Sequence, residues 1–363
     1  MTVTASAPCR LDFAGGWTDV EPYATERGGR VVNAAIEHLA TATVDLAAQR
    51  YRLESLDLGR TVDAADSPEL AAEAGLDLLR AAVRFSGVGP CRLATRSDAP
   101  PGSGLGSSGA MGVALVAALD RTLGRTCSAT ETAERAWRLE AVEARLPGGK
   151  QDQFAAALGG FQALTFSGDR VECRPLDLDG ALMDWLESHI VVCYTGQSRV
   201  SGDTIARVMD GYRRRDPVIV AALDGLAETA DRMAEALLRG EVSEVGRLLT
   251  TNWKHQQRLD SGMGTPLMAQ LEQAMAGAGS LGGKAAGAGA GGSMFFVIAD
   301  DPAPGNLASP CCHSNGRPRE SAFGDDRGYH GSEGRVSVRR PGRVDGEPGG
   351  QGKQDRRSVG RRP

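Results

Sequence analysis

A lysine and an aspartate lie two positions apart in "LPGGKQDQFAAALGG" (146–160), where Lys150 and Asp152 follow a diglycine and open a short apolar segment. A carboxylate can accept or orient the proton of a hydroxyl group, and a nearby cation can stabilise the negative charge that develops during a reaction. Next to a phosphate-binding loop, such a pair would suit phosphoryl transfer to a sugar hydroxyl. The spacing leaves open whether both side chains face one pocket.

A stretch rich in glycine and serine, "PPGSGLGSSGAMGVALVAAL" (100–119), runs directly into an apolar helix. Glycines let a phosphate approach the backbone, and the N–H groups and dipole of a helix N-terminus favour an anion. Ser107 and Ser108 could cap the helix and offer hydroxyl ligands to a phosphate or to Mg²⁺. The stretch lacks the lysine of G-x-x-x-x-G-K-[ST]. Taken alone, it could equally be a flexible loop before a core helix.

Two further segments favour the first interpretation. In "RLDFAGGWTD" (10–19), a strand ends in two glycines and then presents Trp17, Thr18 and Asp19. By itself, Asp19 could also cap a turn. The segment "GGKAAGAGAGG" (282–292) is a second glycine-rich loop suited to close backbone approach.

The elements that must position these segments are a mixture of strands and helices with no internal repeat. Ser67-Pro-Glu predicts the start of one helix, and "SATE" (128–131) is a capping box at the start of another. Strands are expected at 2–14, 31–46, 164–166, 190–194 and 294–299. Helices are expected at 67–85, 110–123, 128–145, 152–158, 218–238, 242–253 and 266–276.

Composition excludes several classes of protein. The 363 residues are enough for two ordinary domains. A net charge of −5 gives no reason to expect nucleic acid or an anionic membrane as a partner. No stretch reaches the roughly 18 apolar residues of a transmembrane helix, and the N-terminus lacks a signal-peptide pattern. The seven cysteines are scattered, except for Cys311 and Cys312, and they form no C-x-x-C pair and no ligand-like cluster with histidine. We therefore expect a cytoplasmic protein with reduced thiols and without structural zinc.

The character of the sequence changes at about Pro302. The stretch 302–363 contains no isoleucine and no leucine after Leu307, and it is dense in arginine, glycine and proline. Such a sequence cannot bury enough apolar surface to offset its ordering entropy. It is interpreted either as a disordered basic tail or as out-of-frame translation of a GC-rich gene. The abrupt change after the predicted strand "MFFVIAD" favours the second interpretation.

Taken together, these motifs resemble those of the GHMP kinase superfamily, which includes galactokinases, homoserine kinases and mevalonate kinases. "PPGSGLGSSGA" is similar to its ATP-binding motif, "RLDFAGGWTD" to its N-terminal sugar motif and "GGKAAGAGAGG" to its third motif. The resemblance runs from about Ala7 to Ala299. Within the superfamily, "LPGGKQDQFAAALGG", "YTGQSRVSGD" (194–203) and "NWKHQQRLDSGMGTP" (252–266) look most like sugar anomeric kinases of the D-glycero-D-manno-heptose 7-phosphate kinase type.

The resemblance implies ATP and Mg²⁺ as cofactors. Ser108 would approach Mg²⁺ together with Glu140, which lies twelve residues before Asp152. Glu143 is a rival for that role, and Glu140 could also be a plain exposed helix residue. The ATP phosphates would be wrapped by Pro101, Gly102, Ser103, Gly104, Leu105, Gly106, Ser107 and Ser108.

For the reaction itself, the resemblance implies that Asp152 is the catalytic base. Arg10 falls where galactokinases carry an arginine that assists this aspartate and stabilises the transferring phosphate. Lys150 would add a second positive charge. Gly109 stands where the family often has serine or alanine, and glycine should be harmless so close to a helix N-terminus.

For the substrate, the resemblance implies that Asp19 binds sugar hydroxyls, with Thr18 beside it. Trp17 stands where heptose kinases of this branch have glycine, and a "GGW[ST]D" form looks more like fucokinases. The Trp17 indole could stack on a sugar face or pack against the core, and the sugar face is favoured. Ser198 and Arg199 would contact the distal part of the substrate, where an arginine suits a phosphate. A solvated loop explains these two residues equally well.

The implied fold is α+β in two lobes, with ATP and sugar meeting between them. Residues 1–170 would form the GHMP N-terminal, ribosomal-protein-like domain, and 171–301 a ferredoxin-like C-terminal domain. The implied activity is phosphorylation of the anomeric hydroxyl of a sugar phosphate of the heptose 7-phosphate or octose 8-phosphate type, serving nucleotide-sugar or antibiotic-sugar biosynthesis.

Two alternatives stay open. One is a hexose kinase of the fucokinase or galactokinase type. The other is a non-catalytic nucleotide- or sugar-binding relative, against which the presence of Asp152 argues. The implied partner is a small-molecule sugar or sugar phosphate, and a homodimer is compatible with the resemblance.

Overall fold

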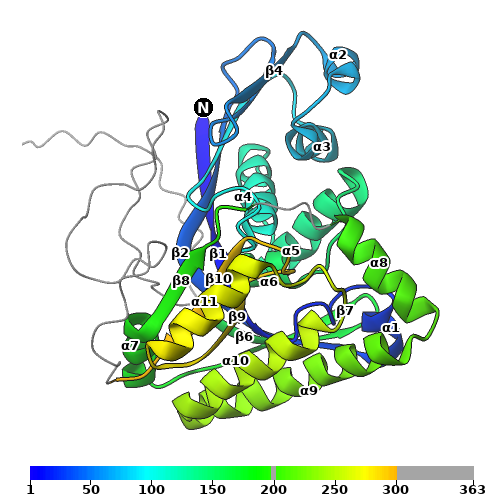
Figure 1. Cartoon of the computed structure of the whole chain (residues 1–363). Coiled ribbons are helices and arrows are strands. Elements are labelled where there is room, and N and C mark those ends of the chain that lie inside the picture. Colours follow the sequence, from blue (N-terminus) through cyan, green and yellow to red (C-terminus); the bar gives the residue numbers. More distant parts are fainter. Residues whose placement is uncertain (198–201, 301–363) are drawn as a thin grey trace, which may run out of the picture.

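The computed structural model describes residues 1–197 and 202–300, which fold around two β-sheets flanked by helices (Figure 1). The first sheet has the order β4-β3-β5-β2-β6-β7 with β1 paired to β2, and the second has the order β8-β10-β9. The strands are β1 (Thr2–Ala14), β2 (Gly29–Asp45), β3 (Tyr51–Ser55), β4 (Arg60–Ala64), β5 (Arg92–Ser97), β6 (Phe161–Ser167), β7 (Arg170–Pro175), β8 (Ile190–Tyr194), β9 (Ser280–Ala285) and β10 (Ser293–Ile298). The helices are α1 (Tyr23–Arg27), α2 (Ser67–Ala72), α3 (Asp77–Ser86), α4 (Ser107–Thr122), α5 (Ala129–Trp137), a π-helical segment (Arg138–Glu143), α6 (Gln151–Leu158), α7 (Gly180–His189), α8 (Gly202–Arg213), α9 (Pro217–Arg239), α10 (Val242–Gln257) and α11 (Pro266–Gly277).

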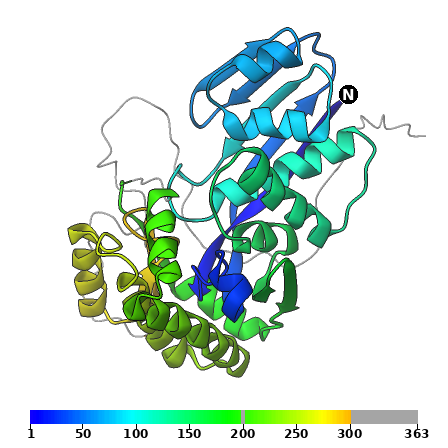
Figure 2. The ribbon, with the colours of Figure 1, turned by 90° about the vertical axis from the view of Figure 1, so that its right-hand side faces the viewer.

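The long antiparallel pair of β1 and β2 extends through most of the molecule. It runs from the lobe that carries α2 and α3 down to the helices of the C-terminal half (Figures 1 and 2). Helix α4 packs on this pair, and nearly all of its apolar side chains are buried because other elements surround it. Helix α4 therefore lies in the core, and its N-terminus points toward the C-terminal end of β1.

The C-terminal half shares its core with the first sheet. Helix α9 begins at Pro217, where the Asp216 side chain accepts hydrogen bonds from two backbone N–H groups, and it ends at Gly240 in the left-handed conformation. Its buried face, including Met233 and Leu237, belongs to the same hydrophobic cluster as Leu11 of β1. The two halves are therefore packed against each other beside the site.

Most of the expected elements are present, and the α+β two-lobed architecture is confirmed. The single helix predicted over 67–85 is wrong in its middle, because α2 ends at Ala72 and α3 begins at Asp77. Gly75 lies between them with a positive φ of 84°, which a continuing helix does not allow. The sequence patterns missed the elements α1, β3, β4, β5, β7, α7 and α8.

The first sheet runs on to Pro175, since β7 pairs with β6. One expected boundary also differs from the structure. The loop expected over 282–292 begins as a strand, because β9 pairs with β10 as far as Ala285. The expected tail, 302–363, lies outside the described residues.

Candidate active site

Arg10 and Asp152 form the centre of the candidate site. The Arg10 Nε donates to Asp152 Oδ1 at 2.8 Å. The Arg10 side chain is only 6% exposed, whereas that of Asp152 is 28% exposed. Among the described residues, no group donates to Asp152 Oδ2. The structure thus holds one carboxylate oxygen and leaves the other without a donor among the described residues, on a side chain that is partly exposed, as suits a group that receives a proton.

The Arg10 guanidinium has a fixed orientation because it has two backbone partners besides Asp152, and the Arg10 backbone has a third. Its Nη1 donates to the carbonyl oxygens of Gly104 at 2.6 Å and Ala286 at 3.1 Å, and its backbone N–H donates to Leu105 O at 2.8 Å. Burial lowers the pKa of Arg10, but the charges of Asp152 and Asp12 outweigh it, so the pKa lies above its ordinary value. Arg10 is therefore a permanent cation between the two glycine-rich segments.

The predicted ATP loop, 101–108, adopts the backbone that a phosphate cradle needs. Gly102, Gly104 and Gly106 all have φ between 71° and 77°, and Gly106 directly precedes α4. The side chains of Ser103 and Leu105 are buried, so these two residues can offer only their backbone to a ligand. Pro101 and Ser108 are exposed.

The second glycine-rich segment lies against this loop. The Ser293 N–H donates to Ser103 O at 2.7 Å. A Cβ on Gly287 would lie 2.6 Å from Gly104 O, and one on Gly292 would lie 2.8 Å from Ser103 O. Side chains at either position would separate the two segments, which explains why glycine is present.

Ser108 and Glu140 come together, as a pair of Mg²⁺ ligands requires. The Ser108 hydroxyl donates to Glu140 Oε1, and the Gln153 amide donates to Glu140 Oε2 at 2.6 Å. Burial raises the pKa of Glu140 more than these hydrogen bonds lower it. Glu143 lies elsewhere, with Oε2 3.8 Å from Arg84 Nη2.

This donor set fits Mg²⁺ bound together with a nucleotide. Mg²⁺ prefers hard oxygen ligands and usually takes only one or two from the protein, with the rest from phosphates and water. Within the described part of the chain, no group of three or more His, Cys, Asp or Glu side chains could hold a metal alone. Glu140 and Ser108 therefore suit a metal that arrives with phosphates.

Asp19 is buried beside the N-terminus of α6. Its Oδ2 accepts the backbone N–H of Gln151 at 3.0 Å. The pKa of Asp19 is raised to about 6, chiefly by burial and also by the charges of Asp152 and Asp12, against the lowering effect of the Gln151 hydrogen bond. A Cβ on Gly149 would lie 1.9 Å from Asp19 Oδ2, so only glycine leaves room for this carboxylate.

The expected sugar contacts of Trp17 and Thr18 are not supported. Trp17 is 5% exposed and packs with Tyr212 and Trp253 in the second hydrophobic cluster, so its ring faces the core. Thr18 is fully buried, and its hydroxyl donates to Gly15 O at 2.7 Å and lies 2.9 Å from Arg30 O. Both residues shape the loop that carries Asp19. Ser198 and Arg199 lie outside the described residues.

Lys150 is not the cation beside Asp152. Its side chain is buried and turns toward the β6–β7 hairpin, where Nζ lies 3.4 Å from Gly168 O. The ammonium also lies 4.6 Å from the centre of the Trp137 ring. Lys150 therefore anchors the start of α6, and Arg10 takes the place beside Asp152.

Gly109 has a closer neighbour than expected. A Cβ at this position would lie 2.5 Å from the Cβ of Asp152. The glycine is therefore not merely tolerated, because it lets the N-termini of α4 and α6 meet at the candidate base.

Three buried polar residues that support the site were not predicted from the sequence: Asp12, Lys284 and Asn252. Lys284 of β9 donates to Asp12 Oδ2 at 2.9 Å and to Asp12 O at 2.6 Å. Asn252 of α10 accepts the backbone N–H of Gly15 at 2.9 Å. Lys284 lies in a glycine-rich pattern and Asn252 in an amphipathic helix. Neither pattern indicates that the side chain reaches β1.

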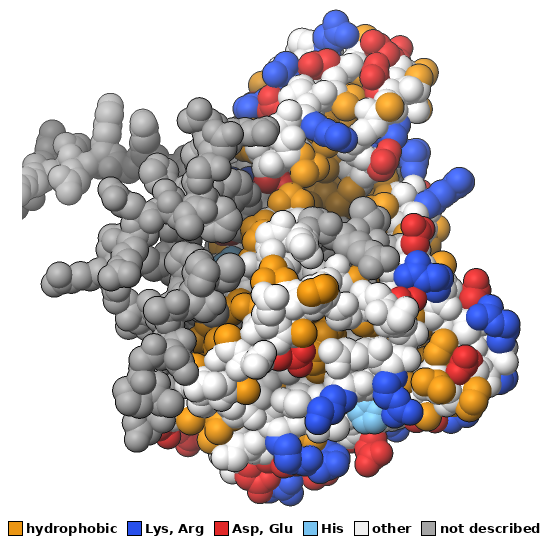
Figure 3. All heavy atoms as spheres, in the orientation of Figure 1, with side chains coloured by type: hydrophobic (Ala, Val, Ile, Leu, Met, Phe, Trp, Pro, Cys, Tyr) orange, Lys and Arg blue, Asp and Glu red, His pale blue; other side chains and the backbone are white. Residues whose placement is uncertain are grey.

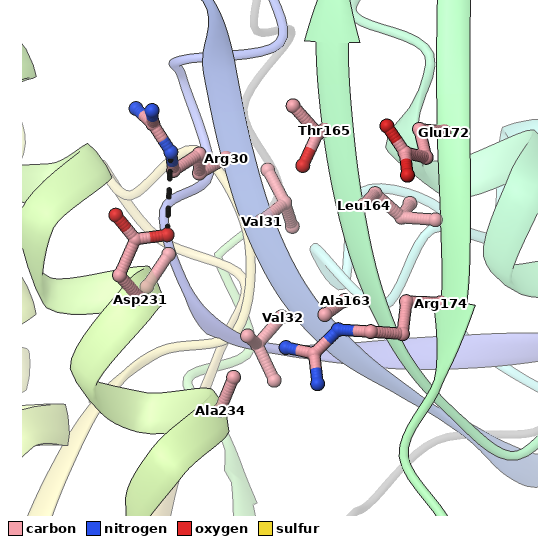
Figure 4. Close-up of a pocket in the computed structure, with 11 residues that line it drawn as sticks. Arg30, Val31, Val32, Ala163, Leu164, Thr165, Glu172, Arg174, Asp231 and Ala234 are labelled. Atoms are coloured by element: carbon pink, nitrogen blue, oxygen red, sulfur yellow. Dashed lines mark ion pairs between the residues drawn. The ribbon is translucent and has the colours of Figure 1, made fainter.

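A separate pocket lies between α9 and the strands β2, β6 and β7 (Figure 4). Arg30 and Asp231 form an ion pair of 3.2 Å at its rim. None of the candidate residues lines this pocket.

On the face of the molecule seen in Figure 3, charged side chains gather on the lobe of α2 and α3 and over α8 and α9. The middle of this face shows mostly backbone, uncharged and hydrophobic atoms.

Comparison with known proteins identifies the family. The family model "GHMP kinases N terminal domain" matches residues 69–160, and "GHMP kinases C terminal" matches residues 233–315. The chain belongs to the GHMP kinases.

Particular relatives narrow the class. A D-glycero-alpha-D-manno-heptose 7-phosphate kinase of Campylobacter jejuni is 28% identical over 82% of this chain and 89% of its own length. An L-fucokinase/L-fucose-1-P guanylyltransferase of Bacteroides fragilis is 27% identical over 83% of this chain, which spans 35% of that longer protein. A solved D-glycero-D-manno-heptose 1-phosphate kinase of Bacteroides thetaiotaomicron superposes with a TM-score of 0.66 at 28% identity, covering 82% of this chain and 88% of its own. The relatives indicate a sugar kinase.

Within residues 1–197 and 202–300, no helix combines the length and apolar character needed to span a bilayer.

Proposed function

We propose that this protein is an ATP- and Mg²⁺-dependent kinase that phosphorylates the anomeric hydroxyl of a sugar phosphate, of the heptose 7-phosphate or octose 8-phosphate type. The observation that carries the proposal is the Arg10–Asp152 pair, held between the two glycine-rich segments at the start of α4. The relatives named as heptose phosphate kinases cover most of the chain and support the substrate class.

Each residue of the site has a separate role in the proposed reaction. Asp152, whose side chain is partly exposed, accepts the proton of the sugar hydroxyl as the hydroxyl oxygen attacks phosphorus. Arg10 orients Asp152 and faces the phosphoryl group as it transfers. Bound Mg·ATP supplies the phosphoryl group and the metal charge that neutralises it. Backbone N–H groups of the 101–108 loop hold the phosphates, and Ser108 and Glu140 hold the metal.

A hexose substrate is the second candidate, because relatives named as fucokinases match at similar identity. Trp17 does not distinguish a hexose from a sugar-phosphate substrate, because its ring is buried. Arg199, which is expected to contact a distal phosphate, lies outside the described residues.

We infer an N-terminal domain over 1–170, a C-terminal domain over 171–301, a cytoplasmic location, and a role in nucleotide-sugar or antibiotic-sugar biosynthesis. A small-molecule sugar or sugar phosphate is the proposed partner, and the homodimer is testable by light scattering.

The test is ADP formation with Mg·ATP across free hexoses and heptose or octose phosphates, followed by ³¹P NMR of the product. Phosphate on C1 of a sugar phosphate is the expected result. Turnover of fucose or galactose alone would move the assignment to the hexose kinases. ATP binding without turnover of any sugar would support the non-catalytic alternative.

A further inference from the structure

Two side chains of β1 reach the second glycine-rich segment with matching spacing. Arg10 Nη1 donates to Ala286 O at 3.1 Å, and Lys284 Nζ donates to Asp12 at 2.6 Å (O) and 2.9 Å (Oδ2). Residue 10 is thus joined to 286 and residue 12 to 284, as in two successive rungs of an antiparallel pair. Here side chains make the rungs, because Arg10 and Asp12, two residues apart on a strand, point to the same side.

The second rung is a fully buried ion pair. The Lys284 side chain is 0% exposed and that of Asp12 is 3% exposed. Burial lowers the pKa of Lys284, and the charge of Asp12 opposes that effect. Removing one partner of such a pair leaves a buried charge uncompensated, whereas neutralising both removes that penalty.

The two rungs are linked through the chain. Ala286 follows Lys284 by two residues, and its carbonyl oxygen is one of the groups that orient the Arg10 guanidinium. The planar, multi-donor geometry of an arginine makes its direction sensitive to each acceptor. A shift of β9 away from Asp12 would therefore move an acceptor of Arg10 and, through it, the contact to Asp152.

We propose that Lys284 is a positioning residue for phosphoryl transfer, which holds the Ala286 carbonyl where it orients Arg10 toward Asp152. The inference rests on the proposed kinase function. Lys284 touches neither substrate nor nucleotide in this role, and it acts through Asp12 and the backbone of β9.

The experiment compares Lys284→Met with the neutral double variant Asp12→Asn/Lys284→Met. We expect Lys284→Met to lower both the melting temperature and kcat. In the double variant, the melting temperature should recover, but kcat should stay about tenfold or more below wild type with each KM within about twofold. The exposed Lys254 on α10 supplies the control, and Lys254→Met should match wild type in both measurements.

A readout without turnover is the NMR signal of the Arg10 Nε–H, assigned by its loss in Arg10→Lys. We expect this signal to shift in the double variant, because its hydrogen bond to Asp152 changes. A double variant with wild-type kcat and an unshifted Arg10 signal would overturn the proposal and leave the ion pair purely structural. If the wild-type protein phosphorylates no sugar, the proposed function fails, and the Arg10 signal alone decides whether Lys284 positions Arg10.

Discussion

Arg10 Nε lies 2.8 Å from Asp152 Oδ1, although 142 positions separate the two residues in the chain. The contact joins the strand that carries the sugar motif to the helix that carries the candidate base. Because the same guanidinium binds Gly104 O and Ala286 O, one side chain connects β1, both glycine-rich segments and α6. The following predictions depend on this arrangement.

Replacing Asp19 should stabilise the protein and impair substrate binding. The pKa of Asp19 is raised from 3.8 to about 6, so the folded state holds its proton more tightly than the unfolded state does. Stability is therefore lost as the pH rises from about 4 to about 6, and ionised Asp19 is unfavourable above that window. We expect Asp19→Asn to raise the free energy of unfolding at pH 8 by about 2 kcal/mol, and by less toward pH 4.

Sugar binding should also depend on the charge of Asp19. In the wild-type protein, KM for the sugar should rise as the pH falls through about 6, because protonated Asp19 accepts hydroxyl hydrogen bonds poorly. Urea unfolding and initial rates between pH 5 and 8 measure the two effects. An Asp19→Asn protein that is less stable at pH 8, or that keeps its KM, would show that Asp19 is not a strained substrate-binding group.

Glu140 and Glu143 should differ in their effect on metal dependence. Glu140→Gln removes the carboxylate that receives the Ser108 hydroxyl, so the Mg²⁺ concentration for half-maximal rate should rise about tenfold or more. Glu143→Gln is the matched control, because Glu143 faces Arg84 instead, and its Mg²⁺ titration should follow that of the wild type. The reverse order in the two titrations would return the metal role to Glu143.

Lys150 should matter for stability more than for the reaction. Lys150→Met removes a buried ammonium from Gly168 O and the Trp137 ring, so we expect a lower melting temperature but kcat within about threefold of wild type. Arg10→Lys keeps the charge but loses the multiple hydrogen bonds, and kcat should fall about a hundredfold. Equal losses of kcat in both variants would mean that Lys150 reaches the transferring phosphate.

Gly109 should be intolerant of a single methyl group. Gly109→Ala places a Cβ 2.5 Å from the Cβ of Asp152, so the two helix N-termini must separate, at a cost of about 1–3 kcal/mol and with a lower kcat. Gly112→Ala on the same helix is the control, because its new Cβ would lie 3.5 Å from the nearest atom, Ala136 O. Identical kcat values for the two variants would refute the role given to Gly109.

Sequence patterns predicted which segments form the site, but not the direction of each side chain. The motifs that contain Arg10, Asp152 and Ser108 do converge, because glycines and helix starts constrain the backbone locally. The spacing left the direction of Lys150 open, since a spacing of two at the start of a helix does not determine which neighbour the longer side chain reaches. Contacts with the β6–β7 hairpin decide that direction.

Trp17 and Lys284 illustrate the same limit over longer distances. The burial of Trp17 depends on residues such as Tyr212 and Trp253, far along the chain, so its own motif could not reveal it. Lys284 lies in a segment whose glycines indicate a loop, but pairing with β10 makes its first part a strand. The short strand β7 was missed because one of its faces is exposed and the other is only partly buried.

The central claim is that Asp152 acts as the base in phosphoryl transfer to a sugar. The most direct measurement is the single-turnover rate of phosphate transfer from Mg·ATP to a heptose phosphate, in the wild-type protein and in Asp152→Asn, with ATP affinity measured in parallel. The account predicts a rate loss of about 10²–10⁴-fold with unchanged ATP affinity, because the asparagine keeps an oxygen toward Arg10 but cannot take the proton. An Asp152→Asn protein that transfers phosphate at the wild-type rate would contradict it.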